Sequence, residues 1–232
     1  MSARASAEPP ARRDVDLDAT FHAFRARTVT LGPTAGARES WHRGRTRYAV
    51  WVLRIDASEV LARMARIAAA LADAIEPVAA ADAHVTTFVA GFPCQDPPAH
   101  DDDVPWTVLD AQAAALASAS LRPVEIEMGG ANAFASCAFL DVKDPHRTLA
   151  RVRDELARVH PEVRFAPYTP HVTIGRFRDV RPTAPIASAL HPHRPLPPIR
   201  VTVRTLELVT FDAHRDGHAT LLTERRVRLG GT

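Results

Sequence analysis

The chain has 232 residues, of which 46% are hydrophobic, so it can bury one large core or two small lobes. Its formal net charge is +2, from 29 basic and 27 acidic side chains, which argues against a protein that wraps nucleic acid by charge alone. No apolar run approaches the roughly 18 residues that a membrane span requires, and we expect a cytoplasmic protein without a membrane partner.

The N-terminal part of the chain differs from the rest. Residues 1–40 combine early prolines, mixed charge and weak periodicity, and predict a loosely ordered arm ahead of a single domain over residues 41–232. Two cysteines, Cys94 and Cys137, follow no metal-ligand spacing, which leaves a pair of free thiols or a disulfide. We expect the protein to act as a monomer.

The first regular elements come directly after the arm. The almost continuous apolar run Tyr48–Ile55 predicts a buried strand. Asp56 or Ser58 is then placed to cap a helix, in which apolar side chains recur at helical spacing as far as Ile75. A strand that carries His84 follows this helix.

The middle of the chain continues with alternating helices and strands. Trp106–Ser120 predicts a helix, Pro123–Met128 alternates as a strand, and Gly129–Asn132 predicts a turn. Ser136–Val142 predicts the next strand, and Asp144–Pro145 is expected to cap and begin a helix. These elements lead to a strand that carries the second motif described below.

The C-terminal part contains fewer signals. Residues 181–198 are rich in proline and leave room for one short helix. Val201–Phe211 and Ala219–Leu229 then predict the two strands of a hairpin.

One short pattern occurs twice, 87 residues apart, as His84–Thr87 and His171–Ile174. The preceding strand and helix match at the same offset, which predicts an internal duplication of a βαβ unit. We therefore expect an α+β fold in which two similar lobes face each other across a central cleft. The two histidine strands would lie at the centre of this arrangement.

A His-x-Thr step on a strand places both side chains on one face, because strand side chains alternate. Two imidazoles can cleave a phosphodiester when one removes a proton from the attacking oxygen and the other protonates the leaving oxygen. Two threonine hydroxyls can donate hydrogen bonds to the non-bridging oxygens as charge develops. This set of groups requires neither a metal nor another cofactor, and we expect none.

The paired motifs, His84–Thr87 and Tyr168–Phe177, resemble those of the two-histidine (2H) phosphoesterase superfamily. That superfamily includes bacterial 2′–5′ RNA ligase-like proteins and cyclic nucleotide phosphodiesterases. The resemblance covers roughly residues 45–229 and rests on the two motifs together with their strands. It implies a bilobal α+β fold with pseudo-two-fold symmetry and two antiparallel sheets. The substrate that it implies is an RNA end or a nucleotide phosphodiester.

The resemblance also implies roles for individual residues, with cleavage of a 2′,3′-cyclic phosphate or a related 2′–5′ or cyclic nucleotide linkage as the expected reaction. Thr87 departs from the family, which usually has an apolar residue at that position. A regular strand would turn Arg176 away from the face that carries His171. The implied acid and base are His84 and His171, the implied phosphate ligands are Thr86 and Thr173, and the accessory substrate contacts are Tyr168 and Arg176.

Two other functions are compatible with the sequence. The same cleft could bind RNA or a nucleotide without catalysis, since a duplicated scaffold can retain binding alone. The run Asp101–Asp103 could serve a metal-dependent hydrolase, although it lacks the spacing of a calcium loop and more simply forms a solvated loop. RNA ligation is less expected than cleavage because the chain has no nucleotide-activation motif.

Overall fold

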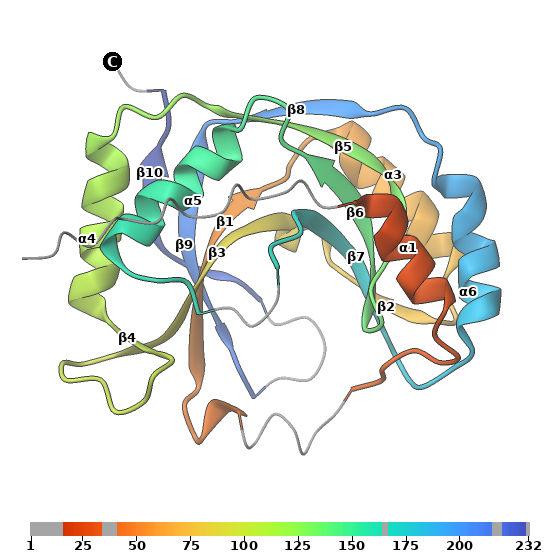
Figure 1. The fold of residues 1–232 in the computed structure, drawn as a ribbon, viewed down its shortest axis with the longest axis horizontal. Coiled ribbons are helices and arrows are strands. Elements are labelled where there is room, and N and C mark those ends of the chain that lie inside the picture. The colour runs from red at the N-terminus through yellow and green to blue at the C-terminus, as the bar shows by residue number, and fades with distance from the viewer. Residues whose placement is uncertain (1–15, 34–40, 164–166, 215–219, 231–232) are drawn as a thin grey trace, which may run out of the picture.

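A computed structural model describes residues 16–33, 41–163, 167–214 and 220–230 of the chain (Figure 1). Its helices are α1 (Leu17–Arg25), α3 (Ser58–Ala70), α4 (Trp106–Ser118), α5 (Thr148–Val159) and α6 (Thr183–Leu190), with short 3₁₀ helices η1 (Ala80–Asp82) and η2 (His191–His193). Its strands are β1 (Arg47–Arg54), β2 (Ile75–Pro77), β3 (His84–Cys94), β4 (Asp103–Pro105), β5 (Val124–Ala133), β6 (Cys137–Lys143), β7 (His171–Phe177), β8 (Ile199–Val203), β9 (Thr205–Asp212) and β10 (Leu222–Arg228).

The strands form one sheet in the order β10-β9-β1-β3-β7-β6-β5-β8, with β2 beside β7 and β4 beside β3. Every pair is antiparallel except β3 with β4. The first half of the sheet consists of β10, β9, β1 and β3, and the second half consists of β7, β6, β5 and β8. The predicted mixed fold with antiparallel strands is confirmed, but the two expected sheets are two halves of one sheet. The two histidine strands are the neighbours at which the halves meet.

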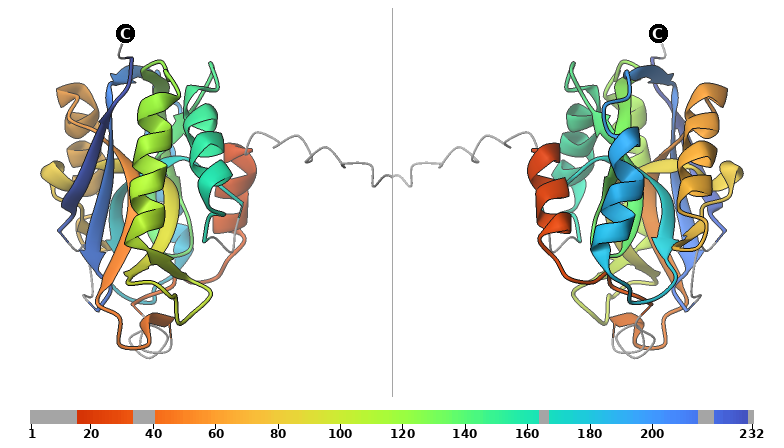
Figure 2. Two further views of the ribbon diagram at one scale, coloured as in Figure 1. Left: turned by 90° about the vertical axis from the view of Figure 1, so that its left-hand side faces the viewer. Right: turned by 90° about the vertical axis from the view of Figure 1, so that its right-hand side faces the viewer.

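Helices cover both halves of the sheet (Figure 2). α4 and α5 pack against each other, and α5 contacts β3, whereas α3 contacts β7 and α1 contacts β5. Figure 2 shows α1 and α3 on opposite sides of the strands. One continuous apolar core includes Trp51, whose indole Nε1 donates to Oε1 of Gln112 on α4 at 2.9 Å. Within the described residues, none of the helices is long and apolar enough to span a membrane.

The first motif lies on a strand with a defined irregularity. On β3, His84 is opposite Arg54 of β1, and Thr86 is opposite Val52. The next pair along the strand joins Phe88 to β1, so Thr87 is left without a partner residue and forms a β-bulge. Thr87 is fully buried. Its bulge resets the alternation of side chains beyond it.

The second motif repeats this register on β7. His171 is opposite Asp141 of β6, Thr173 is opposite Phe139, and Ile174 is the residue left without a partner. The two bulges therefore occupy the same motif position, 87 residues apart in the chain. A shared register with a shared irregularity is what an internal repeat predicts.

Most of the predicted elements are present, but the first helix is shorter than expected. α3 ends at Ala70, and Ile75 belongs to β2, where it pairs with Phe177. Ile75 is buried because it lies in this strand, although its spacing from the apolar residues before it fits a helix. The predicted cap is also wrong, because the N-cap residue is Ala57 and no side chain caps the helix.

The predicted turn at Gly129–Asn132 is wrong, because these residues lie within β5. A β-carbon on Gly130 would lie 1.9 Å from the carbonyl oxygen of Arg194, so glycine allows another segment to cross the strand there. The turn into β6 comes later, between Ala133 and Cys137. Of the two adjacent glycines, Gly130 therefore marks a close backbone approach in this strand.

Two further boundaries differ from the prediction. α5 begins at Thr148, three residues after Pro145, and Asp144 accepts a hydrogen bond from the amide of Ala150 at 2.8 Å. The segment Ile199–Val203 pairs with β5 as β8, so only β9 and β10 form the predicted hairpin. Val201 thus belongs to the other half of the sheet.

Part of the predicted N-terminal arm is folded. Within residues 16–33, α1 is capped by Asp16 and buries Phe21 and Phe24. The amide of Thr30 donates to the carbonyl of Arg181 at 2.9 Å. A loose arm is therefore not what residues 16–33 form, whereas residues 1–15 and 34–40 lie outside the described part of the chain. The domain boundary at residue 41 stays a prediction.

Candidate active site

The two motifs meet where β3 and β7 touch. These strands pair through Val85 and Val172, both fully buried in the core. When the antiparallel register is extended by one residue in each direction, each motif histidine comes opposite the threonine of the other motif. Four half-buried side chains share the face that points away from the core: His84, Thr86, His171 and Thr173.

Both imidazoles are held in the same way. Nδ1 of His84 lies 2.7 Å from the carbonyl oxygen of Asp82, and Nδ1 of His171 lies 2.8 Å from that of Thr169. Because a carbonyl can only accept, the hydrogen is assigned to Nδ1 in each ring. This assignment directs Nε2 of both rings toward proton transfer.

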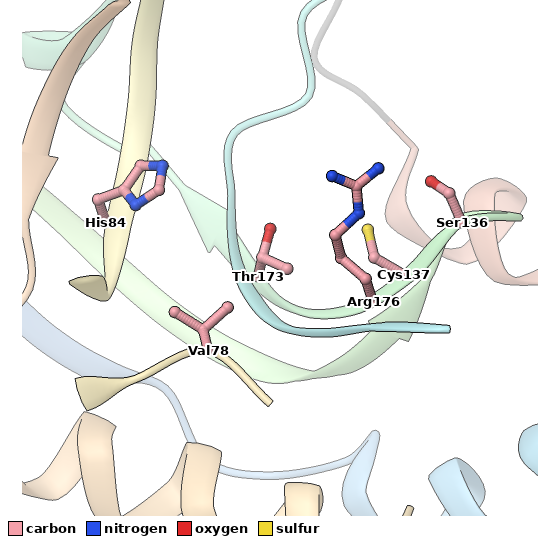
Figure 3. Close-up of a pocket in the computed structure, with 6 residues that line it drawn as sticks. All are labelled: Val78, His84, Ser136, Cys137, Thr173 and Arg176. Atoms are coloured by element: carbon pink, nitrogen blue, oxygen red, sulfur yellow. The ribbon is translucent and has the colours of Figure 1, made fainter. Parts of the chain in front are cut away.

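A pocket of about 200 Å³ opens beside His84 and Thr173, whereas His171 and Thr86 are not among its lining residues. Figure 3 shows Thr173 between the imidazole of His84 and the guanidinium of Arg176. The bulge at Ile174 explains the position of Arg176, because it returns that side chain to the face of Thr173. β7 is therefore not a regular strand, and Arg176 is not turned away from the face of Thr173. The pocket is lined by Val78, His84, Ser136, Cys137, Thr173 and Arg176.

Two phenylalanines beside His171 were not identified from the sequence. Phe134 and Phe139 stack on each other with ring centroids 4.3 Å apart, and each lies 5.1 Å from the imidazole of His171. Phe134 comes from the turn between β5 and β6 and is half-buried. Phe134 was missed because the turn was predicted at Gly129–Asn132, before its true position. The separation of 37 residues between Phe134 and His171 does not by itself indicate a contact.

Tyr168 lies next to the first motif and does not line the pocket. Its hydroxyl donates to the carbonyl oxygen of Thr86 at 2.9 Å. The guanidinium of Arg153 lies 3.6 Å from the centre of its ring. Both of these contacts are to the protein itself, and the predicted substrate contact by Tyr168 stays a prediction.

The residues opposite the two histidines on the neighbouring strands differ in kind: an arginine lies opposite His84 and an aspartate lies opposite His171. Arg54, opposite His84, donates to the carbonyl of Ala81 at 2.9 Å and lies 3.3 Å from a carboxylate oxygen of Glu207. Asp141, opposite His171, accepts from the side-chain amide of Asn132 at 2.9 Å. Burial raises the pKa of Asp141 to about 6, although the hydrogen bond from Asn132 partly opposes this shift.

The raised pKa of Asp141 predicts a pH-dependent stability. Because the folded protein binds this proton more tightly than the unfolded chain, its contribution to stability is lost as the pH rises from about 4 through about 6. We expect Asp141→Asn, which keeps an oxygen for Asn132, to raise the free energy of unfolding at pH 7.5 by about 1 to 2 kcal/mol. Urea unfolding at pH 7.5 and at pH 4 measures this, and an equal gain at both values would contradict it.

The aspartate run is engaged by an arginine. Nη1 of Arg45 lies 2.6 Å from Asp102 and 2.5 Å from Asp103. Among the described residues, no group of three or more metal-ligating side chains is arranged to hold an ion. Of the two alternatives left open for Cys94 and Cys137, the structure has free thiols. Burial raises the pKa of the Cys137 thiol to about 11, so it is protonated at neutral pH.

Comparisons with known proteins identify a sequence family and similar folds. Residues 56–215 match the 2′-5′ RNA ligase superfamily. The fold is similar to that of E. coli LigT in its apo form, with a TM-score of 0.57 and 16% identity over 81% of this chain and 100% of that one. It is also similar to TT0787 of Thermus thermophilus, with a TM-score of 0.55 and 15% identity over 79% of this chain and 98% of that one.

Structures of E. coli LigT complexed with nucleotides have the same fold. The complex with 3′-AMP matches with a TM-score of 0.58 and 17% identity over 80% of this chain and 99% of that one. A complex of LigT with ATP matches with a TM-score of 0.55. No curated protein sequence matches this chain significantly.

Proposed function

This chain belongs to the 2′-5′ RNA ligase superfamily, and on that basis we propose that it is a metal-independent phosphodiesterase. It would cleave 2′,3′-cyclic phosphates or related 2′–5′ or cyclic nucleotide linkages by acid–base catalysis with His84 and His171. The observation that carries this proposal is the identical anchoring of both rings through Nδ1, which makes Nε2 of each ring the nitrogen that can accept a proton.

In the proposed reaction, Nε2 of one histidine removes a proton from water as its oxygen forms a bond to phosphorus. Nε2 of the other histidine donates a proton to the sugar oxygen as its bond to phosphorus breaks. The product is a phosphomonoester with a free sugar hydroxyl. The hydroxyls of Thr86 and Thr173 donate to the non-bridging oxygens, which gain charge in the transition state.

The surroundings of the motifs support a nucleotide or RNA end as substrate. Arg176 at the pocket offers a planar, permanently charged donor for a phosphate. The half-buried ring of Phe134, next to His171, offers an aromatic surface for a base. The complex of E. coli LigT with 3′-AMP supports the same class of ligand.

Hydrolysis of a panel of 2′,3′-cyclic nucleotides and of an RNA with a cyclic-phosphate end tests the proposal. Assays contain a chelator, so that turnover in its presence supports chemistry by the side chains alone. Loss of all turnover in the chelator would instead support the metal-dependent alternative. Binding without turnover over prolonged incubation would identify a non-catalytic RNA- or nucleotide-binding module.

We also propose that the protein works in the cytoplasm as a monomer. The two unpaired thiols, Cys94 and Cys137, support a reducing compartment. Light scattering of the purified protein tests the monomeric state.

A further inference from the structure

The backbone of the first motif is held by side chains from a distant segment. β3 and β7 share the pair formed by Val85 and Val172, and the residues of β3 that follow are not paired to β7. Buried backbone groups need hydrogen-bond partners, so this stretch of β3 must find them elsewhere. Residues of α5 and of the segment that leads to the second motif provide them.

Tyr168 makes the contact closest to the catalytic groups. Its hydroxyl donates to the carbonyl oxygen of Thr86 at 2.9 Å, and Arg153 covers its ring at 3.6 Å. That carbonyl belongs to the peptide group joining Thr86 to Thr87. Its orientation sets the backbone angle ψ of Thr86, and the rotamers open to the Thr86 side chain depend on the backbone angles.

Arg153 and Glu162 hold this arrangement together. Nη1 of Arg153 donates to the carbonyl of Thr87, and Nη2 lies 2.6 Å from a carboxylate oxygen of Glu162. The other carboxylate oxygen of Glu162 accepts from the amide of Val89 at 2.9 Å. Arg153 is 5% exposed, so these charge-assisted bonds act in a largely dry environment.

The second motif is supported differently. β2 runs beside β7, where Pro77 pairs with Gly175, and the amide of Val78 donates to the carbonyl of Ile174 at 2.9 Å. Backbone hydrogen bonds from β2 therefore do for the second motif what the side chains of Tyr168, Arg153 and Glu162 do for the first. Because the first support uses side-chain groups, substitutions can remove its hydrogen bonds one at a time.

We propose that Tyr168 is a positioning residue, which orients the hydroxyl of Thr86 toward the phosphate through the Thr86 carbonyl. Arg153 and Glu162 hold Tyr168 and the adjacent backbone in place. This inference rests on the proposed function, because it takes Thr86 as a phosphate ligand. A positioning role differs from a substrate contact by Tyr168, because the essential group is the hydroxyl and its partner is the carbonyl oxygen of Thr86.

Tyr168→Phe tests the inference, since it removes the hydroxyl and keeps the ring. We expect kcat/KM to fall about three- to tenfold, the effect of one hydrogen bond. Tyr48→Phe is the matched control, because Tyr48 is the other tyrosine of the chain. Tyr48 lies in β1, where its ring packs against those of Phe92 and Phe211. The control variant should keep wild-type kcat/KM. A stacking role would instead leave Tyr168→Phe at wild-type activity and raise KM in Tyr168→Leu, which would overturn the proposal.

Double substitutions identify the residue through which Tyr168 acts. In a Thr86→Val background, Tyr168→Phe should cause no further loss, because the hydroxyl that it orients is gone. In a Thr173→Val background, its full three- to tenfold effect, about that of one hydrogen bond, should remain. Equal losses in both backgrounds would mean that Tyr168 acts on the fold in general, and would overturn the proposal.

A failure of the proposed function can be told apart from a failure of this inference. If the wild-type protein turns over no phosphodiester, the same variants are titrated with 3′-AMP by calorimetry. Weaker binding by Tyr168→Phe that disappears in the Thr86→Val background would support the positioning role without catalysis. Equal effects in both backgrounds, or no binding of 3′-AMP by the wild type, would overturn it.

Discussion

Replacing His84 or His171 by alanine is expected to lower kcat for a cyclic phosphodiester by about 100- to 10,000-fold. Each imidazole would perform one of the two proton transfers. After either substitution, the remaining histidine cannot perform both transfers. Since both side chains are half-buried on the face away from the core, the melting temperature should change little. Steady-state kinetics and thermal unfolding of the same preparations give both quantities.

Three further results would support the pair. The double variant should be scarcely slower than either single variant, because residues that act as a unit do not contribute additively. The pH profile of kcat/KM should be bell-shaped, and its two apparent pKa values should describe the histidine pair rather than either residue alone. His146→Ala is a control, because that side chain is 64% exposed. Near-full activity of both single variants would refute the assignment.

Gly130→Ala is expected to lower the free energy of unfolding by about 3 kcal/mol or more, whereas Gly129→Ala should cost about 1 kcal/mol. A β-carbon at residue 130 would lie 1.9 Å from the carbonyl oxygen of Arg194, a backbone atom that cannot move alone. At residue 129 the nearest atom is the β-carbon of Asp141, at 3.2 Å, which belongs to a side chain.

Urea unfolding of the two glycine variants measures this difference. Their positions are adjacent in the same strand, so the comparison controls for strand propensity. Similar losses in both variants would mean that the segment around Arg194 does not cross β5 as closely as described.

Several features could be predicted from the sequence because they depend on short-range periodicity. The apolar run at Tyr48–Ile55 had to be a buried strand, and β1 covers nearly the same residues. The alternation within each His-x-Thr step placed Val85 and Val172 in the core and the histidines on the other face of their strands. The repeat at one offset predicted that the two strands would be central, and they are neighbours in the sheet.

Other local signals were read incorrectly because two structures share the same pattern. Ile75 has the spacing of a helix but is buried as a strand residue by its pairing with Phe177. Gly129–Gly130 has the composition of a turn, yet Gly130 lies where the segment around Arg194 crosses the strand. Each of these outcomes depends on a partner far away in the chain, which local periodicity does not record.

The sequence by itself determined which residues carry the two motifs and which face of each strand they share, because strand alternation is a property of the backbone. Only the tertiary structure decided what surrounds them. The bulge at Ile174 brings Arg176 to the pocket, and the contact of Tyr168 with Thr86 joins residues 82 positions apart. A bulge arises from pairing with a neighbouring strand, and long-range contacts arise from packing, so neither is encoded at a fixed spacing along the chain.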